Sequence, residues 1–160
     1  MISITIVAVG KIKEKFYTDA VAEYSKRLKR YCKLNIVEVK DEPTPDNQSN
    51  REREIILSCE GKRLSEKIPK SAYVVALCIE GKMMSSEKFS DHIQKMAVDG
   101  NGEIVFVIGG SMGICDDIKK CADLKLSFSE MTFPHQLMRV VLLEQIYRAF
   151  NIAEGGKYHK

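Results

Sequence analysis

The sequence has no C-x-x-C pair, and its five cysteines form an odd set scattered along the chain. Disulfide frameworks and zinc clusters use paired, closely spaced cysteines, so the pattern favours neither. The chain also lacks a cluster of residues with metal-ligand spacing. We therefore expect reduced thiols, a cytoplasmic location and no bound metal.

Long apolar runs are absent as well. The N-terminal stretch Met1–Val9 is too short to span a bilayer, and it lacks the basic start and the cleavage site of a signal peptide. Hydrophobic residues make up 44% of the chain and charged residues 29%, values typical of a globular protein rather than a disordered or membrane-bound one. A length of 160 residues predicts one domain, residues 1–160, with no membrane partner.

Two nucleotide-binding motifs are missing. No Walker sequence is present, which argues against a nucleotide hydrolase. The glycines of "VIGGSMG" are not spaced as in dinucleotide folds, because Ile108 stands where the first glycine would be. Asp116 and Asp117 follow this cluster and disfavour a phosphate ligand, although they suit the start of a helix. The cluster therefore predicts either a tight turn or a site for a ligand without phosphate.

Apolar runs rich in β-branched residues alternate with amphipathic helical patterns. This βαβαβαβ order predicts an α/β fold with a mostly parallel sheet, helices on both faces, and ligands at the carboxyl ends of the strands. Ser49 and Glu52 have the spacing of a capping box at the start of the second helix. The predicted strands are Ile2–Val9, Leu34–Val39, Tyr73–Ile79 and Glu103–Gly109, and the predicted helices cover 15–31, 50–68 and 86–97.

A fifth strand, Asp123–Ser129, precedes a polar loop and a long helix. Pro134 suits the first turn of that helix, and Thr132 is placed to help cap it. At 100° per residue, His135, Gln136 and Arg139 project from the same sector of the first turn. The pattern predicts a polar site at this helix end.

The rest of this helix is apolar nearly all the way round, from Leu137 to Phe150. One side of it can pack on its own sheet, so we expect the other side to meet a second subunit. Glu144 and Arg148 lie four residues apart and predict an ion pair. Near the other end of the chain, Lys11–Lys33 carries eight basic residues against three acidic ones, which fits either a solvated helix face or an RNA-facing patch.

Several motifs together resemble one known family. They are "AVGKIKEKFY", "EGKMMSSE", "FVIGGSMG", "LSFSEMTFPHQLMRVVLLEQIYRAF" and the terminal "YHK", and the similarity covers essentially the whole chain. The chain resembles the bacterial large-subunit ribosomal RNA methyltransferases of the SPOUT, or α/β-knot, superfamily. This resemblance implies an S-adenosylmethionine-dependent enzyme that methylates N3 of a pseudouridine in helix 69 of the large-subunit rRNA. It also implies a homodimer with a C-terminal trefoil knot.

The resemblance further implies a cofactor pocket made by three loops. Apolar side chains there can enclose the adenine while main-chain amides read its edge, and glycine allows the ligand to approach the backbone. Glu130 has no special role in this scheme beyond its place in the third loop. The implied pocket residues are Leu77, Gly109, Phe128, Ser129, Glu130, Met131, Thr132 and Phe133.

The methyl transfer requires an acceptor nitrogen freed of its proton and held in line with the methyl group. The candidate catalytic residues are His135, Arg139, Tyr158 and His159, with a histidine as the candidate base. The tail "GGKYHK" predicts a flexible arm in which Lys157, Tyr158, His159 and Lys160 contact RNA, with a disordered terminus as the alternative. A noncatalytic ribosome-binding module remains the competing class. The partners expected are a second copy of the chain and large-subunit rRNA in the assembled ribosome.

Overall fold

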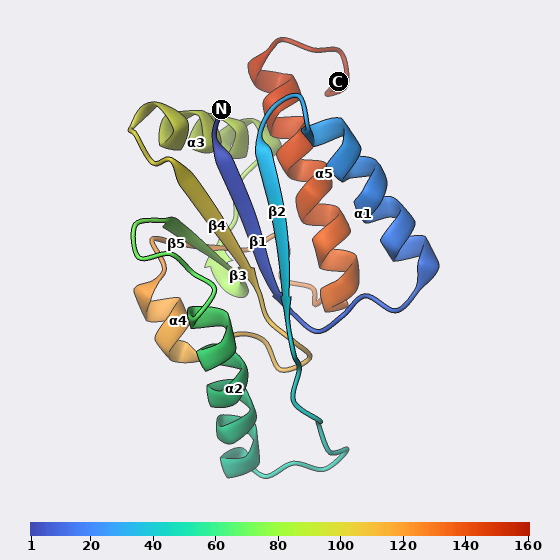
Figure 1. Ribbon diagram of the computed structural model, residues 1–160, viewed down its shortest axis with the longest axis vertical. Helices are drawn as coiled ribbons and strands as arrows, with labels where there is room; N and C mark the ends of the chain where they lie inside the picture. The colour runs from blue at the N-terminus through green and yellow to red at the C-terminus, as the bar shows by residue number, and fades with distance from the viewer.

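A computed structural model describes residues 1–160 and contains one five-stranded parallel sheet, in the order β2-β1-β4-β3-β5 (Figure 1). All four strand pairings are parallel, so every strand ends at the same edge. The predicted parallel sheet is confirmed. The strands are β1 (Ser3–Val9), β2 (Lys33–Val39), β3 (Tyr73–Lys82), β4 (Glu103–Ile108) and β5 (Leu124–Leu126).

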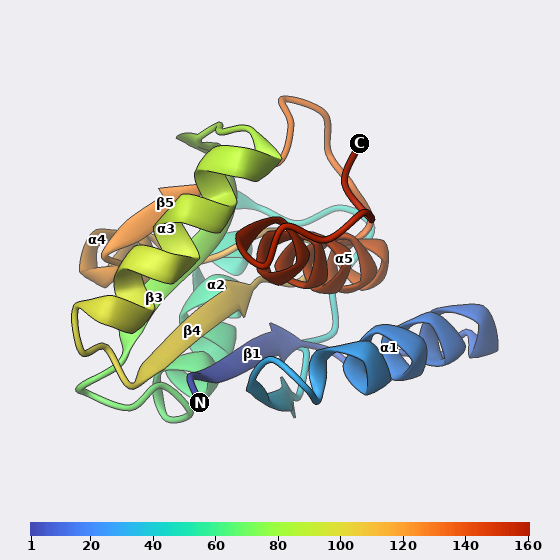
Figure 2. The ribbon, with the colours of Figure 1, turned by 90° about the horizontal axis from the view of Figure 1, so that it is seen from above.

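Five helices cover both faces of the sheet, as predicted. Figure 2 shows α3 and α5 side by side over the sheet, with α1 next to α5. The opposite face carries α2 and α4, which lie together below β3 in Figure 1. The helices are α1 (Lys15–Leu28), α2 (Asn50–Ser65), α3 (Ser86–Val98), α4 (Asp116–Cys121) and α5 (His135–Ala153).

Alternation along the strands produces two hydrophobic cores. In β1, Ile4 and Ile6 face the core under α1, α3 and α5, whereas Val7 and Val9 face the core under α2 and α4. Neighbouring side chains of a strand point to opposite faces, so a strand buried on both sides is apolar throughout. These central strands therefore read as continuous apolar runs in the sequence.

Most of the predicted helix starts agree with the structure. The capping box of α2 is confirmed, since Ser49 Oγ accepts from Glu52 N and the Glu52 carboxylate accepts from Ser49 N. The start of α5 differs from the prediction. Pro134 occupies the N-cap position, α5 begins at His135, and no side chain caps it, so Thr132 does not have the expected capping role. Proline fixes φ there and lacks an N–H, which leaves one donor fewer to satisfy.

Candidate functional site

A cavity of about 690 Å³ lies at the carboxyl ends of β3, β4 and β5. This is the edge where α/β proteins bind ligands, and the volume is in the usual range for a small-molecule site. Its walls come from the end of β3, the loop after β4, and the segment between β5 and α5. Of the residues predicted to bind a cofactor, all line the cavity except Glu130: they are Leu77, Gly109, Phe128, Ser129, Met131, Thr132 and Phe133.

The glycine loop after β4 is shaped by its own backbone. Gly113 N donates to Gly110 O at 3.0 Å, and Gly113 has a φ of 84°, which favours glycine. A Cβ on Gly109 would overlap the backbone carbonyl of Gly113. The closure of this turn therefore requires glycine at position 109, whereas close approach of a ligand to Gly109 stays a prediction. The predicted tight turn is confirmed, and because this turn lines the cavity, the predicted ligand site remains open.

β3 and the segment after β5 approach each other unusually closely at Gly81. A Cβ there would lie 2.7 Å from Leu126 C and 2.8 Å from Leu126 N. Ser127 N also donates to Lys82 O at 3.0 Å. Gly81 was not predicted from the sequence, although an isolated glycine inside a strand pattern is a signal for close backbone approach. This contact holds the segment between β5 and α5, one wall of the cavity, against the end of β3, another wall.

The segment between β5 and α5 is folded by short local hydrogen bonds. Ser127 Oγ donates to Ser129 O at 3.0 Å, and Ser129 Oγ accepts from Met131 N at 3.0 Å. Phe128 lies edge-on to Phe89 of α3, with ring centroids 6.4 Å apart. Met131 is 77% exposed and thus stands at the mouth of the cavity rather than in its interior.

His135 is the histidine that lines the cavity. Burial lowers the pKa of its imidazole below the ordinary value, and the nearby Arg139 guanidinium adds to this effect. The ring is therefore neutral at pH 7 and has a lone pair that can accept a proton. Its neighbour Gln136 does not line the cavity, and its Oε1 accepts from Lys13 N at 3.4 Å.

Arg139 does not line the cavity. The side chain is 2% exposed. Its Nη2 donates to Val9 O at 3.0 Å and to Gly10 O at 2.5 Å, and its Nη1 pairs with Glu38 Oε2 at 2.5 Å. Through these contacts Arg139 connects the first turn of α5 to the ends of β1 and β2.

Charged side chains at the cavity rim were missed by the sequence analysis. Lys119 Nζ lies 2.5 Å from Glu80 Oε1, and this hydrogen bond lowers the pKa of the Glu80 carboxyl. Arg53 of α2 reaches the rim from the other side and has no ion-pair partner. Only the packing of α2 and α4 beside the glycine loop brings these three residues together, so no sequence motif indicates them.

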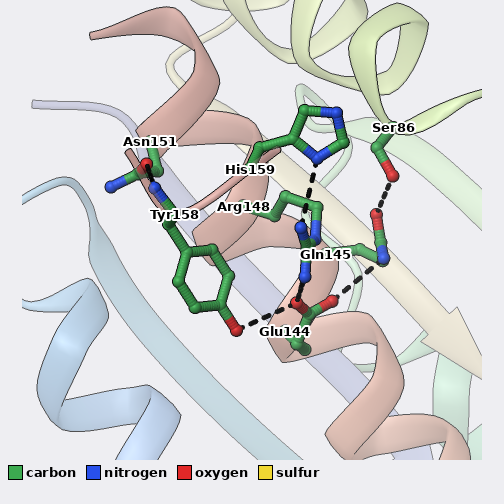
Figure 3. A network of polar contacts seen from close by, with 7 residues as sticks. All are labelled: Ser86, Glu144, Gln145, Arg148, Asn151, Tyr158 and His159. Atoms are coloured by element: carbon green, nitrogen blue, oxygen red, sulfur yellow. Dashed lines mark hydrogen bonds and ion pairs between the residues drawn. The ribbon is translucent and has the colours of Figure 1, made fainter. Parts of the chain in front are cut away.

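The C-terminal tail, residues 154–160, lies against α3 and α5 rather than in the cavity (Figure 3). Tyr158 Oη donates to Glu144 Oε1 at 3.1 Å, and the predicted ion pair between Glu144 and Arg148 is confirmed. His159 contacts Arg148 and Glu87. Tyr158 and His159 are half-buried, whereas Lys157 and Lys160 are exposed.

The tail and His135 lie at different levels of α5. Glu144 follows His135 by nine residues, which places it about 13 Å further along the helix axis. The candidate catalytic residues therefore fall into two groups within one chain. His135 lines the cavity, while Tyr158 and His159 are held near the far end of the same helix.

The structure contains no group of three or more His, Cys, Asp or Glu side chains arranged to hold a metal ion. None of its helices combines the length and the apolarity that crossing a membrane requires.

Comparison with known proteins places the chain in a family. The family model described as "Predicted SPOUT methyltransferase" matches residues 2–159. Proteins named "Ribosomal RNA large subunit methyltransferase H" from Clostridium kluyveri and Clostridium acetobutylicum are 57% and 53% identical to this chain, and each alignment covers 99% of both proteins.

Solved structures agree on the fold. A probable methylase family protein from Haemophilus influenzae Rd KW20 has a TM-score of 0.56 and is 11% identical, over 98% of this chain and 70% of the other. The tRNA (m1G37) methyltransferase from Aquifex aeolicus has a TM-score of 0.51 and is also 11% identical, over 91% of this chain and 69% of the other.

Proposed function

Because the chain belongs to the SPOUT methyltransferase family, we propose that it methylates N3 of a pseudouridine in helix 69 of the large-subunit rRNA. S-adenosylmethionine is the methyl donor, and the substrate is the assembled ribosome in the cytoplasm. Support comes from the names of relatives that match at 53–57% identity over 99% of both chains. Membership of an enzyme family also argues against the noncatalytic ribosome-binding module.

The observation that carries the proposal is the cavity formed by the three predicted loops. Leu77, Phe128 and Phe133 give it apolar walls suited to an adenine ring, and the turns at Gly109 and Ser129 supply main-chain groups that can read the edge of the ring. When bound, S-adenosylmethionine supplies an electrophilic methyl group. Residues Leu77, Gly109 and Phe128–Phe133 would hold it, with Glu130 outside the lining.

His135 is the proposed base. It would accept the N3 proton of the target and so leave that nitrogen with a lone pair for the methyl group that bound S-adenosylmethionine would supply. The role fits His135 because its lowered pKa keeps the ring neutral at pH 7 and because it lines the cavity. Arg139 contributes by holding the first turn of α5, through its bonds to Val9 O and Gly10 O.

The proposal includes RNA contacts by the tail, a homodimer and a trefoil knot. Lys157 and Lys160 are exposed cations suited to phosphate groups, and Tyr158 offers a ring face. Leu137 and Val141 lie on the outer side of α5, partly exposed, where a second subunit can cover them. A knot requires chain segments to pass close to one another, and Gly81 lies in tight contact with Leu126.

Purified ribosomes test the function directly. Ribosomes with and without pseudouridine in helix 69 are incubated with the protein and labelled S-adenosylmethionine, and the modified nucleotide is identified by mass spectrometry. We expect label only on ribosomes that contain pseudouridine, and at N3. Equal labelling of both ribosome samples would contradict the proposed target, and binding of ribosomes without any transfer would contradict the enzyme.

The role of His135 has its own test. His135→Gln should lower kcat by about a hundredfold, the usual contribution of a positioned base, while S-adenosylmethionine still binds. His92→Gln is the matched control, because His92 lies outside the cavity on α3. Loss of donor binding in His135→Gln, or a normal kcat, would assign His135 to the pocket wall alone.

A further inference from the structure

The docked tail is joined to the body by hydrogen bonds at both nitrogens of one imidazole, and Figure 3 shows the one between His159 and Arg148. His159 Nδ1 lies 3.1 Å from Arg148 Nη1, and His159 Nε2 lies 2.8 Å from Glu87 Oε1. Arg148 belongs to α5 and Glu87 to the first turn of α3. The ring thus bridges two helices that are distant in the sequence.

The chemistry of the two partners decides which nitrogen carries the proton. A guanidinium can only donate, so Nδ1 must accept from Arg148. The ring proton is then on Nε2, which donates to the Glu87 carboxylate. The two contacts thus select a single tautomer of docked His159, with the proton on Nε2 and the Nδ1 lone pair directed at Arg148. His135, by contrast, lines the cavity.

The remainder of the tail is ordered by its own contacts. Arg148 Nε donates to Glu144 Oε1 at 3.0 Å, and the same oxygen accepts from Tyr158 Oη at 3.1 Å. The Tyr158 ring is edge-on to Tyr147, with centroids 4.9 Å apart, and lies under the Arg148 guanidinium. Burial raises the pKa of Tyr158 to about 12, so its hydroxyl stays a donor.

Gly155 and Gly156 act as a defined bend rather than a flexible linker. Gly155 has a φ of 68°, a backbone conformation that favours glycine. A Cβ on Gly156 would overlap the Asn151 side chain, whose Oδ1 accepts from Tyr158 N at 3.1 Å. The expected flexible arm is thus replaced by a tail folded back onto α5.

The docked tail continues a basic surface that begins on α1. Arg27 lies over the ring of Tyr147, 5.6 Å from its centroid, and Tyr147 in turn contacts Tyr158. Arg30 Nη2 lies 3.1 Å from Glu154 at the base of the tail. Exposed ion pairs of this kind are weak and can exchange for phosphate groups. The last turn of α1 and the tail therefore form one surface with the character of an RNA contact.

We propose that Glu87, Glu144 and Arg148 are positioning residues that hold the tail docked as a preformed part of the RNA-binding surface. This inference rests on the proposed function, because it assigns RNA as the partner of that surface. It differs from a mobile arm, since the docked state is the working state. A preformed surface also avoids the entropy cost of ordering seven residues at each binding event.

Glu87 gives the sharpest test because its side chain is 59% exposed and replacements there leave the core intact. A glutamine keeps an acceptor for His159 Nε2–H, whereas a lysine offers only donors. Glu87→Gln should therefore retain near wild-type activity, and Glu87→Lys should lower kcat/KM for ribosomes by about tenfold, the effect of losing one charge-assisted hydrogen bond. Affinity for S-adenosylmethionine should stay within about twofold in both variants.

Asp91→Lys is the matched control. Asp91 lies one turn further along α3, is exposed and has no ion-pair or hydrogen-bond partner, so this variant makes the same change of charge without touching the tail. Its kcat/KM should not fall. If Glu87→Lys behaves like Asp91→Lys, or methylates faster than the wild type, the docked tail is a resting state and the inference is wrong.

Nitrogen NMR of the His159 ring in the free wild-type protein tests the inference without any activity. The ring should show a proton on Nε2 and a lone pair on Nδ1 in the wild type and in Glu87→Gln, and averaging of the two tautomers in Glu87→Lys. Averaging already in the wild type would overturn the docked arrangement. If the wild type shows the single tautomer but methylates no ribosome, the proposed function fails while the docking stands.

Discussion

Gly109 is the residue with the least freedom in the cavity wall. Any Cβ there overlaps the carbonyl of Gly113. We expect Gly109→Ala to distort the turn, abolish S-adenosylmethionine binding in calorimetry and lower the melting temperature at the same time. The two losses occur together because the turn is a wall of the cavity and also the end of a core strand.

Gly102→Ala is the control for that substitution, since a Cβ at Gly102 meets no atom within 4 Å and its φ is not in the left-handed region. It should leave binding and melting temperature unchanged. A Gly109→Ala protein that melts normally but fails to bind would instead indicate a ligand seated directly on this glycine.

Arg139 is predicted to act on stability. Arg139→Met removes the donors to Val9 O and Gly10 O and leaves these buried carbonyls without partners. The free energy of unfolding in urea should fall by about 3 kcal/mol, as when one partner of a buried pair is removed. Arg30→Met, at an exposed pair, should change it by less than about 0.5 kcal/mol. Loss of methyl transfer at unchanged stability would restore Arg139 as a catalytic candidate.

Helix geometry predicted the positions of His135 and Arg139 on α5, but it did not predict the contacts of both side chains. Helical geometry placed both side chains in one sector beside the cavity loops, and only His135 lines the cavity. Arginine is long enough to reach the end of β1 from α5. Two of its partners are the backbone carbonyls of Val9 and Gly10, more than a hundred residues away, and carbonyls carry no sequence signal.

Among the elements, α5 offers a test of self-association. Val141 is partly exposed on the outer side of α5, whereas Ile146 is fully buried in the core of its own chain. Val141→Glu should therefore give a folded monomer, and Ile146→Glu should give an unfolded protein, because a buried unpaired charge costs several kcal/mol. Light scattering together with circular dichroism separates the two results.

A Val141→Glu protein that remains dimeric would move the interface away from the outer side of α5. The tail already covers part of this side, since Tyr158 and His159 contact Glu144 and Arg148. The sequence indicated an apolar helix in need of two partners. It did not indicate that one partner is the chain's own tail, because the polar bonds that dock the tail join residues without hydrophobic periodicity.

Strand and helix positions follow the sequence closely where the apolar pattern is strong. β1, β2 and β4 agree with their predicted ranges to within one residue at each end. β3 extends to Lys82, beyond the predicted Ile79, and β5 is confined to Leu124–Leu126 within the predicted Asp123–Ser129. The difference arises at Gly81, where β3 meets the β5 segment with a shift of register. A tertiary contact determines where β3 and β5 end, so these ends could not be predicted from local propensity.

For the molecule as a whole, two histidines make stability depend on pH. Burial lowers the pKa of both His92 and His135 below the ordinary 6.5. As the pH falls below 6.5, the unfolded chain binds protons at these rings before the folded chain does. The free energy of unfolding should therefore decrease between about pH 7.5 and about pH 5.5, measured in urea.

His92→Phe should flatten this dependence. The buried Nε2 of His92 has no hydrogen-bond partner, and its ring lies against Tyr73, so phenylalanine can occupy the site without losing a bond. Stability at about pH 5.5 should rise relative to the wild type. An unchanged slope in the variant would mean that groups other than His92 govern the acid range.

The order of elements along the chain has a consequence for biosynthesis. The third wall of the cavity and His135 belong to residues 126–138, which are translated after all of β1 to β4. β1 to β4 can pair while the remainder is still inside the exit tunnel, since domains fold from the N-terminal end as they emerge. A nascent chain from which only β1 to β4 have emerged therefore has two walls of the cavity but lacks the third wall and His135.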